Sequence, residues 1–228
     1  MKEFYEKCVR NLVYGGISKR QYQEIKGDIL EENRRSLSTA SMCLLLMFFV
    51  LFLGSLFSEM MAPNRIAYGV VDMCFLGIWL ACQGVKGKGK GFIIPLWYMA
   101  LTLMCAYAVV LNTVIRKDVT ATTFCLIIIV APMLFTDQPW RIFVYFLIVT
   151  AIFIPIDFQQ KTYYLAYCDM VNVLCCVFIG SVIHIRIIRT KCREMLQRRQ
   201  IEKERDTDKL TGCMTKAAFE KKSLYILS

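Results

Sequence analysis

Six long apolar runs, separated by short connections, decide what this sequence can fold into. Each run approaches the ~20 apolar residues that a helix needs to cross the hydrocarbon core of a bilayer. The runs are too long for the strands of an outer-membrane barrel, in which apolar and polar residues alternate over about 10 residues. They cover about residues 38–58, 66–83, 92–115, 119–135, 141–157 and 163–188. The sequence therefore predicts an all-α membrane protein with six transmembrane helices.

Basic residues predict how these helices are oriented. The net charge is +10, with 28 Lys and Arg residues, and short cytoplasmic segments of membrane proteins collect Lys and Arg. With the N-terminus in the cytoplasm, the basic residues that flank the opposite side are few, namely Arg65, Arg116, Lys117 and Lys161. Both termini are therefore expected in the cytoplasm. Anionic lipid, and not nucleic acid, is the expected partner of the positive charge.

The polar residues before the first run, 1–36, predict two short amphipathic helices in the cytoplasm. Gly15-Gly16 separates them, and Ser18 with Gln21 forms a capping box at the start of the second. Their apolar faces consist of Phe4, Cys8 and Leu12 in the first and Tyr22, Ile25, Ile29 and Leu30 in the second. The second face is expected to lie on the membrane surface or to pack against the last helix. A partly disordered tail is the alternative.

Four polar residues inside the runs are candidates for a ligand site, because polar groups are costly in hydrocarbon and are by default functional there. They are Asp72, Asn112, Asp169 and Asn172. A rise of 1.5 Å per residue places Asp72 and Asp169 at a similar depth, roughly 10 Å below the outer edge. One hypothesis is a polar pocket for a small extracytoplasmic ligand, with walls formed by Tyr68, Tyr107, Tyr163 and Tyr167. The other is that the four residues form hydrogen bonds between helices and fix their packing.

Other residues inside the runs carry weaker signals. The 11 Cys are scattered singly and the chain has one His, His184, so a zinc or other metal site is not expected. His184 is either a pH-sensitive group or simply tolerated near the membrane interface. Pro132 is expected to kink its helix. Gly180 is the only weak point expected in the last run, which contains no Pro.

The last apolar run continues into a charged segment, 189–207, without Pro or Gly in between. This pattern predicts one helix that leaves the membrane and extends into the cytoplasm as a signalling helix. The apolar positions of the extension follow a broken heptad of Ile188, Cys192, Met195 and Ile201. The heptad is compatible with a parallel coiled coil in a homodimer, formed through the sixth run and this helix, and equally with a solvated charged helix.

A short motif follows this helix. It has the form Asp-x-Leu-Thr-Gly-x-x-x-Lys-x-x-Phe, with the residues Asp208, Leu210, Thr211, Gly212, Lys216 and Phe219. The motif resembles the entry of a GGDEF domain, the α/β catalytic domain of diguanylate cyclases, which opens with Asp-x-Leu-Thr-Gly-Leu-x-Asn-Arg-x-x-Phe. Cys213, Thr215 and Lys216 depart from that pattern. The resemblance implies that Lys216 pairs with Asp208 to fasten the turn into the domain.

The resemblance implies the sensory and anchoring half of a diguanylate cyclase in the cytoplasmic (inner) membrane of a bacterium. In the full-length parent, a signal passing through the sixth helix would control the condensation of two GTP into cyclic di-GMP with Mg²⁺. The guanine-contacting segment, the metal-binding carboxylates and the Gly-Gly-Asp/Glu-Glu-Phe signature have no counterpart in residues 1–228. These residues are therefore expected to hold no catalytic site, metal or cofactor of their own.

The expected domains are the N-terminal helices (1–36), a six-helix sensor bundle (37–188), the signalling helix (189–207) and the truncated beginning of a GGDEF domain (208–228). Two other functions stay open. One is a small membrane transporter or channel subunit. The other is a non-catalytic membrane anchor with a degenerate nucleotide-binding domain.

Overall fold

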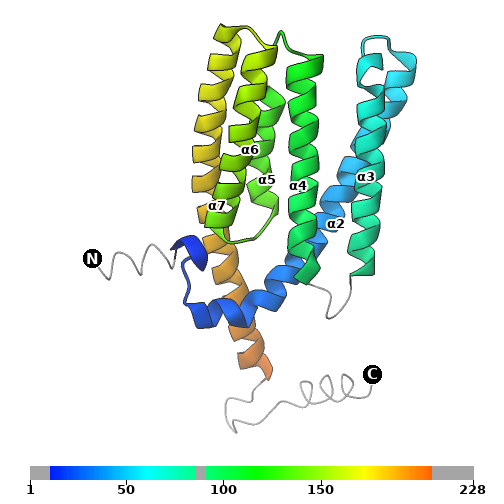
Figure 1. The fold of residues 1–228 in the computed structure, drawn as a ribbon. Coiled ribbons are helices and arrows are strands. Elements are labelled where there is room, and N and C mark those ends of the chain that lie inside the picture. Colours follow the sequence, from blue (N-terminus) through cyan, green and yellow to red (C-terminus); the bar gives the residue numbers. More distant parts are fainter. Residues whose placement is uncertain (1–10, 86–90, 207–228) are drawn as a thin grey trace.

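The computed structural model describes residues 11–85 and 91–206, and within these ranges it consists of helices and short turns, without strands (Figure 1). The elements are α2 (Lys19–Phe57), η1 (Ala62–Asn64), α3 (Arg65–Gly84), α4 (Ile93–Val110), η3 (Leu111–Ile115), α5 (Thr122–Leu134), α6 (Pro139–Gln160) and α7 (Tyr163–Asp206). Five helices are long and apolar enough to cross a membrane: Lys19–Phe57, Ala62–Gly84, Ile93–Ile115, Pro139–Gln160 and Tyr163–Glu202. This is the architecture of an all-helical, multi-pass membrane protein, as the apolar runs predict.

The helices form two groups, which Figure 1 shows side by side. One group is the hairpin of α2 and α3, and the other consists of α4, α5, α6 and α7. The most extensive contacts join α2 to α3, and α7 to α5 and α6. At the lower end in Figure 1, α2 begins beside α7, and towards the upper end it leans away from α4. The two groups nevertheless also meet above the lower end, where Phe48 and Tyr68 pack against Tyr107 and where η1 contacts η3.

α2 joins two segments that the sequence presents as separate. The expected second N-terminal helix and the first apolar run form one helix of 39 residues, because neither Pro nor Gly interrupts residues 31–53. The predicted capping box is confirmed: Ser18 Oγ accepts a hydrogen bond from Gln21 N–H at 3.2 Å, and Gln21 Oε1 accepts one from Ser18 N–H at 3.0 Å. Phe4 and Cys8 of the expected first helix lie outside the described residues.

α5 is shorter than the fourth apolar run predicts. Its 13 residues span about 20 Å at 1.5 Å per residue, which is less than the ~30 Å of the hydrocarbon core. Ala121 and Phe135, just outside its two ends, are not helical and are fully buried. Non-helical backbone at membrane depth is tolerated only where protein covers it and satisfies its polar groups. Both ends of α5 therefore need hydrogen-bond partners from neighbouring helices.

α7 is one helix of 44 residues with a single buried stripe. The buried residues recur every three or four positions, as one face of a helix requires. They are Ala166, Asp169, Val173, Val177, Gly180, His184, Ile188 and Cys192. This face, which we call the α7 stripe, runs from the α6–α7 turn to a point beyond the last apolar run.

At Gly180, α7 continues without a break and comes close to the backbone of α5. A Cβ atom at this position would lie 2.9 Å from the backbone oxygen of Ile128. Pro132 lies four residues after Ile128 and has no N–H, so it leaves this oxygen without its usual helical partner. The bare Cα of Gly180 can approach the oxygen, in the C–H···O contact typical of helix interfaces. Pro132 and Gly180 thus complement each other across the interface.

The N-terminal segment 14–29, which we call the clamp, packs against the lower part of α7. A separate small apolar core forms here from Ile17, Ile25, Ile29, Ile188 and Cys192. The guanidinium of Arg199 on α7 also donates two hydrogen bonds to the Asp28 carboxylate, at 2.6 and 3.1 Å. Of the two positions expected for this amphipathic face, the one against the last helix is confirmed.

Gly15 allows the clamp to approach α7, and its replacement is expected to release the clamp. Its φ is 61°, and a Cβ atom there would lie 2.6 Å from Cγ2 of Ile188. Ala at such a φ costs on the order of 1 kcal/mol or more before the clash is counted. We expect Gly15→Ala to uncover the buried Cys192 and to accelerate its alkylation by a maleimide. The rate is measured in a chain whose other cysteines are replaced by Ser.

Gly27→Ala is the matched control for this experiment. Gly27 lies within α2, and a Cβ atom there meets nothing within 4 Å. Ala in a helix interior is more stable than Gly by roughly 0.5–1 kcal/mol, so the clamp should be at least as firmly held. If Gly15→Ala and Gly27→Ala give the same alkylation rate, Gly15 does not hold the clamp on α7.

Candidate functional site

Polar side chains of α7 bind both ends of α5. At the start of α5, Asp169 Oδ1 accepts a hydrogen bond from Ala121 N–H at 2.8 Å, where the helix dipole also favours a negative charge. At its end, His184 Nδ1 donates a hydrogen bond to Pro132 O at 2.7 Å. A carbonyl oxygen only accepts, so the hydrogen of His184 lies on Nδ1. Both side chains belong to the α7 stripe, which therefore holds α5 at two points.

Asn33 secures the chain just after α5. Its side chain donates a hydrogen bond to Thr136 O at 2.7 Å and accepts one from Thr136 N–H at 2.9 Å. Its backbone oxygen accepts a third from Trp97 Nε1–H at 2.8 Å. Next to Thr136, the Asp137 carboxylate accepts a hydrogen bond from the Tyr98 hydroxyl at 2.9 Å. These contacts tie α2, α4 and the α5–α6 connection together at the lower end.

Three charged side chains meet at the upper end, where α6 turns into α7. Lys161 Nζ lies 2.5 Å from Asp169 Oδ2 and 3.1 Å from Asp157 Oδ1. The Lys161 side chain is 0% exposed and the two aspartate side chains are 1% exposed. Two carboxylates thus share one ammonium group where water has no access. Such a cluster is stable only while its charges stay paired, because an unpaired buried charge is very costly. We call these three residues the Lys161 cluster.

A cavity of about 370 Å³ lies beside Asp169, between α5 and α7. It is lined by Thr120, Ala121, Thr122, Cys125, Leu126, Ile129, Asp169, Asn172, Cys175 and Cys176. Asp169 and Asn172 therefore share one cavity, as their spacing predicts. The two oxygens of Asp169 are already bound to Ala121 and Lys161. Asp169 thus forms hydrogen bonds between helices, and a ligand in this cavity would have to compete for them.

The other two candidates lie elsewhere in the fold. Asp72 is on the buried face of α3, and its Oδ1 is buried without a hydrogen-bond partner among the described residues. Asn112 lies in the π-helical turn η3, and its Nδ2 donates to Ala108 O at 2.7 Å. The Ala108 oxygen also accepts a backbone hydrogen bond from Leu111 N–H, so the Asn112 side chain is bound within its own helix. The four polar candidates therefore do not line one cavity.

The four tyrosines expected as walls are also absent from the lining of the Asp169 cavity. Tyr68 and Tyr107 pack against Phe48 between α2, α3 and α4, with ring centroids 6.3 and 5.0 Å from that of Phe48. Tyr163 and Tyr167 are exposed on α7. The positions of these four tyrosines depend on which helices are neighbours, and residue spacing within one apolar run does not predict the neighbours of a helix.

Three polar residues that join helices in the structure are not predicted from the sequence: Lys161, Asp157 and Asn33. Lys161 lies between two apolar runs, and this position predicts a solvent-exposed loop residue. A usable signal exists for Asp157, because it lies within an apolar run and four residues before Lys161, on the same helical face. Asn33 lies in the charged segment 31–35 and has no such signal.

The domain-entry motif, Asp208 to Phe219, lies outside the described residues. Comparisons of the chain with protein-family models, with curated proteins and with solved structures find no match.

Proposed function

We propose that this chain is the six-span sensory and anchoring part of a bacterial membrane-bound diguanylate cyclase, with both termini in the cytoplasm. The observation that carries the proposal is the α7 stripe, which runs in one helix from the Lys161 cluster to the clamp. A packed helix of this kind shifts as a rigid element, and such shifts are a common form of signal transmission. α7 is described to Asp206, two residues before the motif that resembles the entry of a GGDEF domain.

In this proposal α5 is the additional crossing segment, despite its length. Asp169, His184 and Asn33 supply partners for the backbone at and beyond its ends. A short helix with covered, non-helical ends can therefore bridge the hydrocarbon core. Six crossings place both termini on one side, in agreement with the scarcity of basic residues at the upper end. The upper end then faces the outside of the cell.

We place the response to the signal at the Lys161 cluster and its cavity. A small extracytoplasmic ligand, or a change in the membrane, would compete for the Asp169 carboxylate that holds Ala121 and Lys161. Loss of those bonds would loosen α5 from α7, and α7 would shift relative to the clamp. In the full-length parent, two GGDEF domains would then meet across two GTP molecules with Mg²⁺.

The proposed homodimer needs a face of α7 that the clamp leaves open. Ile188, Cys192 and Met195, the expected coiled-coil positions, contact the clamp of the same chain. Ile201 is 65% exposed. We therefore place the dimer contact around Ile201 and further along the helix, where the clamp does not cover it.

The test of this proposal is a pair of insertions that change the phase of α7. Residues 1–207 are joined to the catalytic domain of a diguanylate cyclase, and helical residues are inserted after Glu204. Two residues rotate the attached domain by about 200°, whereas seven leave it within about 20° of its original phase. We expect cyclic di-GMP production to change strongly with two residues and to persist with seven.

The seven-residue insertion also controls for the added length. Equal production with both insertions, at equal amounts of protein in the membrane, would mean that α7 is a passive tether. The chain would then serve only as an anchor.

A further inference from the structure

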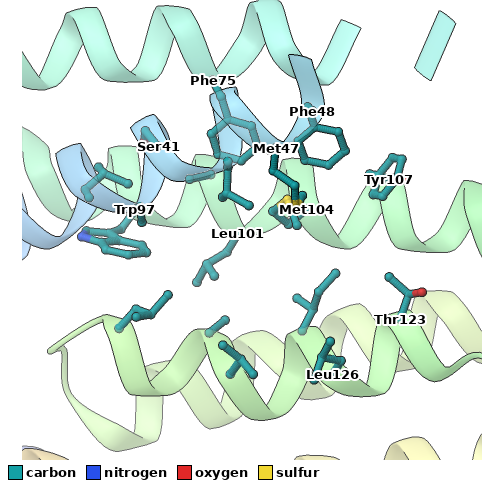
Figure 2. A pocket seen from close by; sticks show the side chains of 18 of the residues that line it. Ser41, Met47, Phe48, Phe75, Trp97, Leu101, Met104, Tyr107, Thr123 and Leu126 are labelled. Atoms are coloured by element: carbon teal, nitrogen blue, oxygen red, sulfur yellow. The ribbon is translucent and has the colours of Figure 1, made fainter. Parts of the chain in front are cut away.

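An apolar crevice lies between α2 and α4 on one side and α5 on the other, with Phe75 of α3 also in its lining. Its volume is about 450 Å³, within the ~300–1,000 Å³ of small-molecule sites. Figure 2 shows side chains of α2 and α4, such as Phe48 and Leu101, on one side of it and Leu126 of α5 on the other. Met47 and Leu126 remain 44% and 61% exposed although they line this space inside the fold.

The crevice is long and runs parallel to the helices. Its lining extends over residues 37–51 of α2, 97–111 of α4 and its π turn, and 123–134 of α5. Fourteen steps of 1.5 Å give a length of about 21 Å along α2 and α4. One leaflet contributes about 15 Å, half of the ~30 Å hydrocarbon core. The crevice is therefore long enough for a whole acyl chain.

The walls of the crevice select an apolar occupant. Ser41 Oγ is buried there without a hydrogen-bond partner among the described residues, and the Trp97 N–H is already bound to Asn33 O. Tyr107 and Thr123 carry the other hydroxyl groups of the lining, and the remaining lining residues are apolar. An empty crevice would forfeit the dispersion contacts of its lining atoms. A charged head group would find no charged side chain among the lining residues.

Two sets of contacts hold α2 in place along the crevice. Asn33 binds Thr136 and Trp97, so α2 is fixed to the second group of helices just before the crevice begins at Leu37. Further along, the ring of Phe48 on α2 packs against that of Tyr107 on α4, with centroids 5.0 Å apart. These contacts hold α2 against α4, and the crevice lies between this pair of helices and α5.

We propose that the crevice is a binding site for one acyl chain of a membrane phospholipid, which enters sideways from the bilayer. The five apolar helices place the surrounding surface in hydrocarbon, so acyl chains are the molecules next to the opening. The length and the apolar walls of the crevice match one such chain. This site is independent of the proposed signalling function and would exist equally in an anchor.

Trp97, 3% exposed and on the wall of the crevice, reports on the occupant. The full chain with Trp79→Phe and Trp140→Phe keeps Trp97 as its single Trp, since the sequence has 3 Trp. It is reconstituted in vesicles of phosphatidylcholine or of the same lipid brominated in the middle of its acyl chains. Bromine quenches Trp emission at short range, so we expect Trp97 to lose most of its emission in the brominated vesicles.

Two matched variants distinguish the crevice from the outer surface. Ala40→Phe adds a ring on the wall of the crevice and should abolish most of the quenching. Ala151→Phe adds the same ring on an exposed position of α6 and should leave it unchanged. Equal thermal unfolding of the two variants shows that both are folded.

Absence of quenching, or equal quenching in both variants, would overturn the proposal, because the crevice would then hold no lipid chain. The lipid retained by the purified chain is also identified by mass spectrometry. A phospholipid whose retention is lost in Ala40→Phe supports the proposal. An isoprenoid quinone in its place would overturn the choice of a phospholipid.

Discussion

Replacing Lys161 with Met is expected to destabilise the bundle by about 3–5 kcal/mol, the usual cost of removing one partner from a buried ion pair. Met keeps most of the length and apolar stem of Lys, so the change removes mainly the charge. The Asp157 and Asp169 carboxylates would remain buried at the upper end without their shared ammonium group. Unfolding of the detergent-solubilised chain in increasing SDS, followed by circular dichroism, measures the loss.

Asp157→Asn is the informative comparison, because it removes a charge from the same cluster and leaves a neutral pair. Lys161 and Asp169 would keep their contact, and Asp169 would keep its hydrogen bond from Ala121 N–H. Neither oxygen of Asp157 has a hydrogen-bond partner among the described residues, although Oδ1 lies 3.1 Å from Lys161 Nζ. We expect a small change in stability for Asp157→Asn. If Lys161→Met unfolds at the same SDS concentration as Asp157→Asn, the cluster does not depend on charge pairing.

The helices could be predicted from the sequence because apolar run length and helical period are local properties. α3, α4 and α6 agree with their runs to within a few residues. α5 also lies within a few residues of the fourth run, 119–135, but the run overstates the length of the helix, because run length counts apolar residues and does not report where the backbone stops being helical. α2 misleads in the opposite direction: polarity changes between residues 30 and 38, but the backbone continues through it. A change of composition marks a change of environment, and not the end of a helix.

The candidate site could be predicted only in part, because its contacts depend on which helices become neighbours. The shared face of Asp169 and Asn172 follows from their spacing within one helix, and the structure shows both residues at one cavity. The bond from Ala121 N–H to Asp169 depends on α5 beginning only at Thr122, and Lys161 reaches Asp169 because the α6–α7 turn is only two residues long. These are tertiary facts that no single run contains. The same holds for His184, whose partner Pro132 is 52 residues away.

Gly180→Ala is expected to cost about 1–3 kcal/mol, the range for adding a methyl group to a fully packed interface. The expectation is opposite in sign to helix propensity, which favours Ala over Gly by roughly 0.8–1.0 kcal/mol in a helix interior. The new Cβ would lie 2.9 Å from the backbone oxygen of Ile128, and a backbone atom cannot move aside as a side chain can. α5 and α7 would have to separate, which would strain the bonds of Asp169 and His184 at the two ends of α5.

Gly77→Ala provides the matched substitution for Gly180→Ala. Gly77 is exposed within α3, and a Cβ atom there meets nothing within 4 Å, so this variant should be neutral or slightly more stable. SDS unfolding of both variants separates the effect of the contact with Ile128 from the effect of the helix propensity of Ala, because only Gly180→Ala adds a methyl group against another helix. Equal unfolding would show that α5 and α7 are not in close contact at Ile128. If only Gly180→Ala is destabilised, the pairing of Pro132 with Gly180 positions α5 on α7, and the same variant in the cyclase fusion should alter its output.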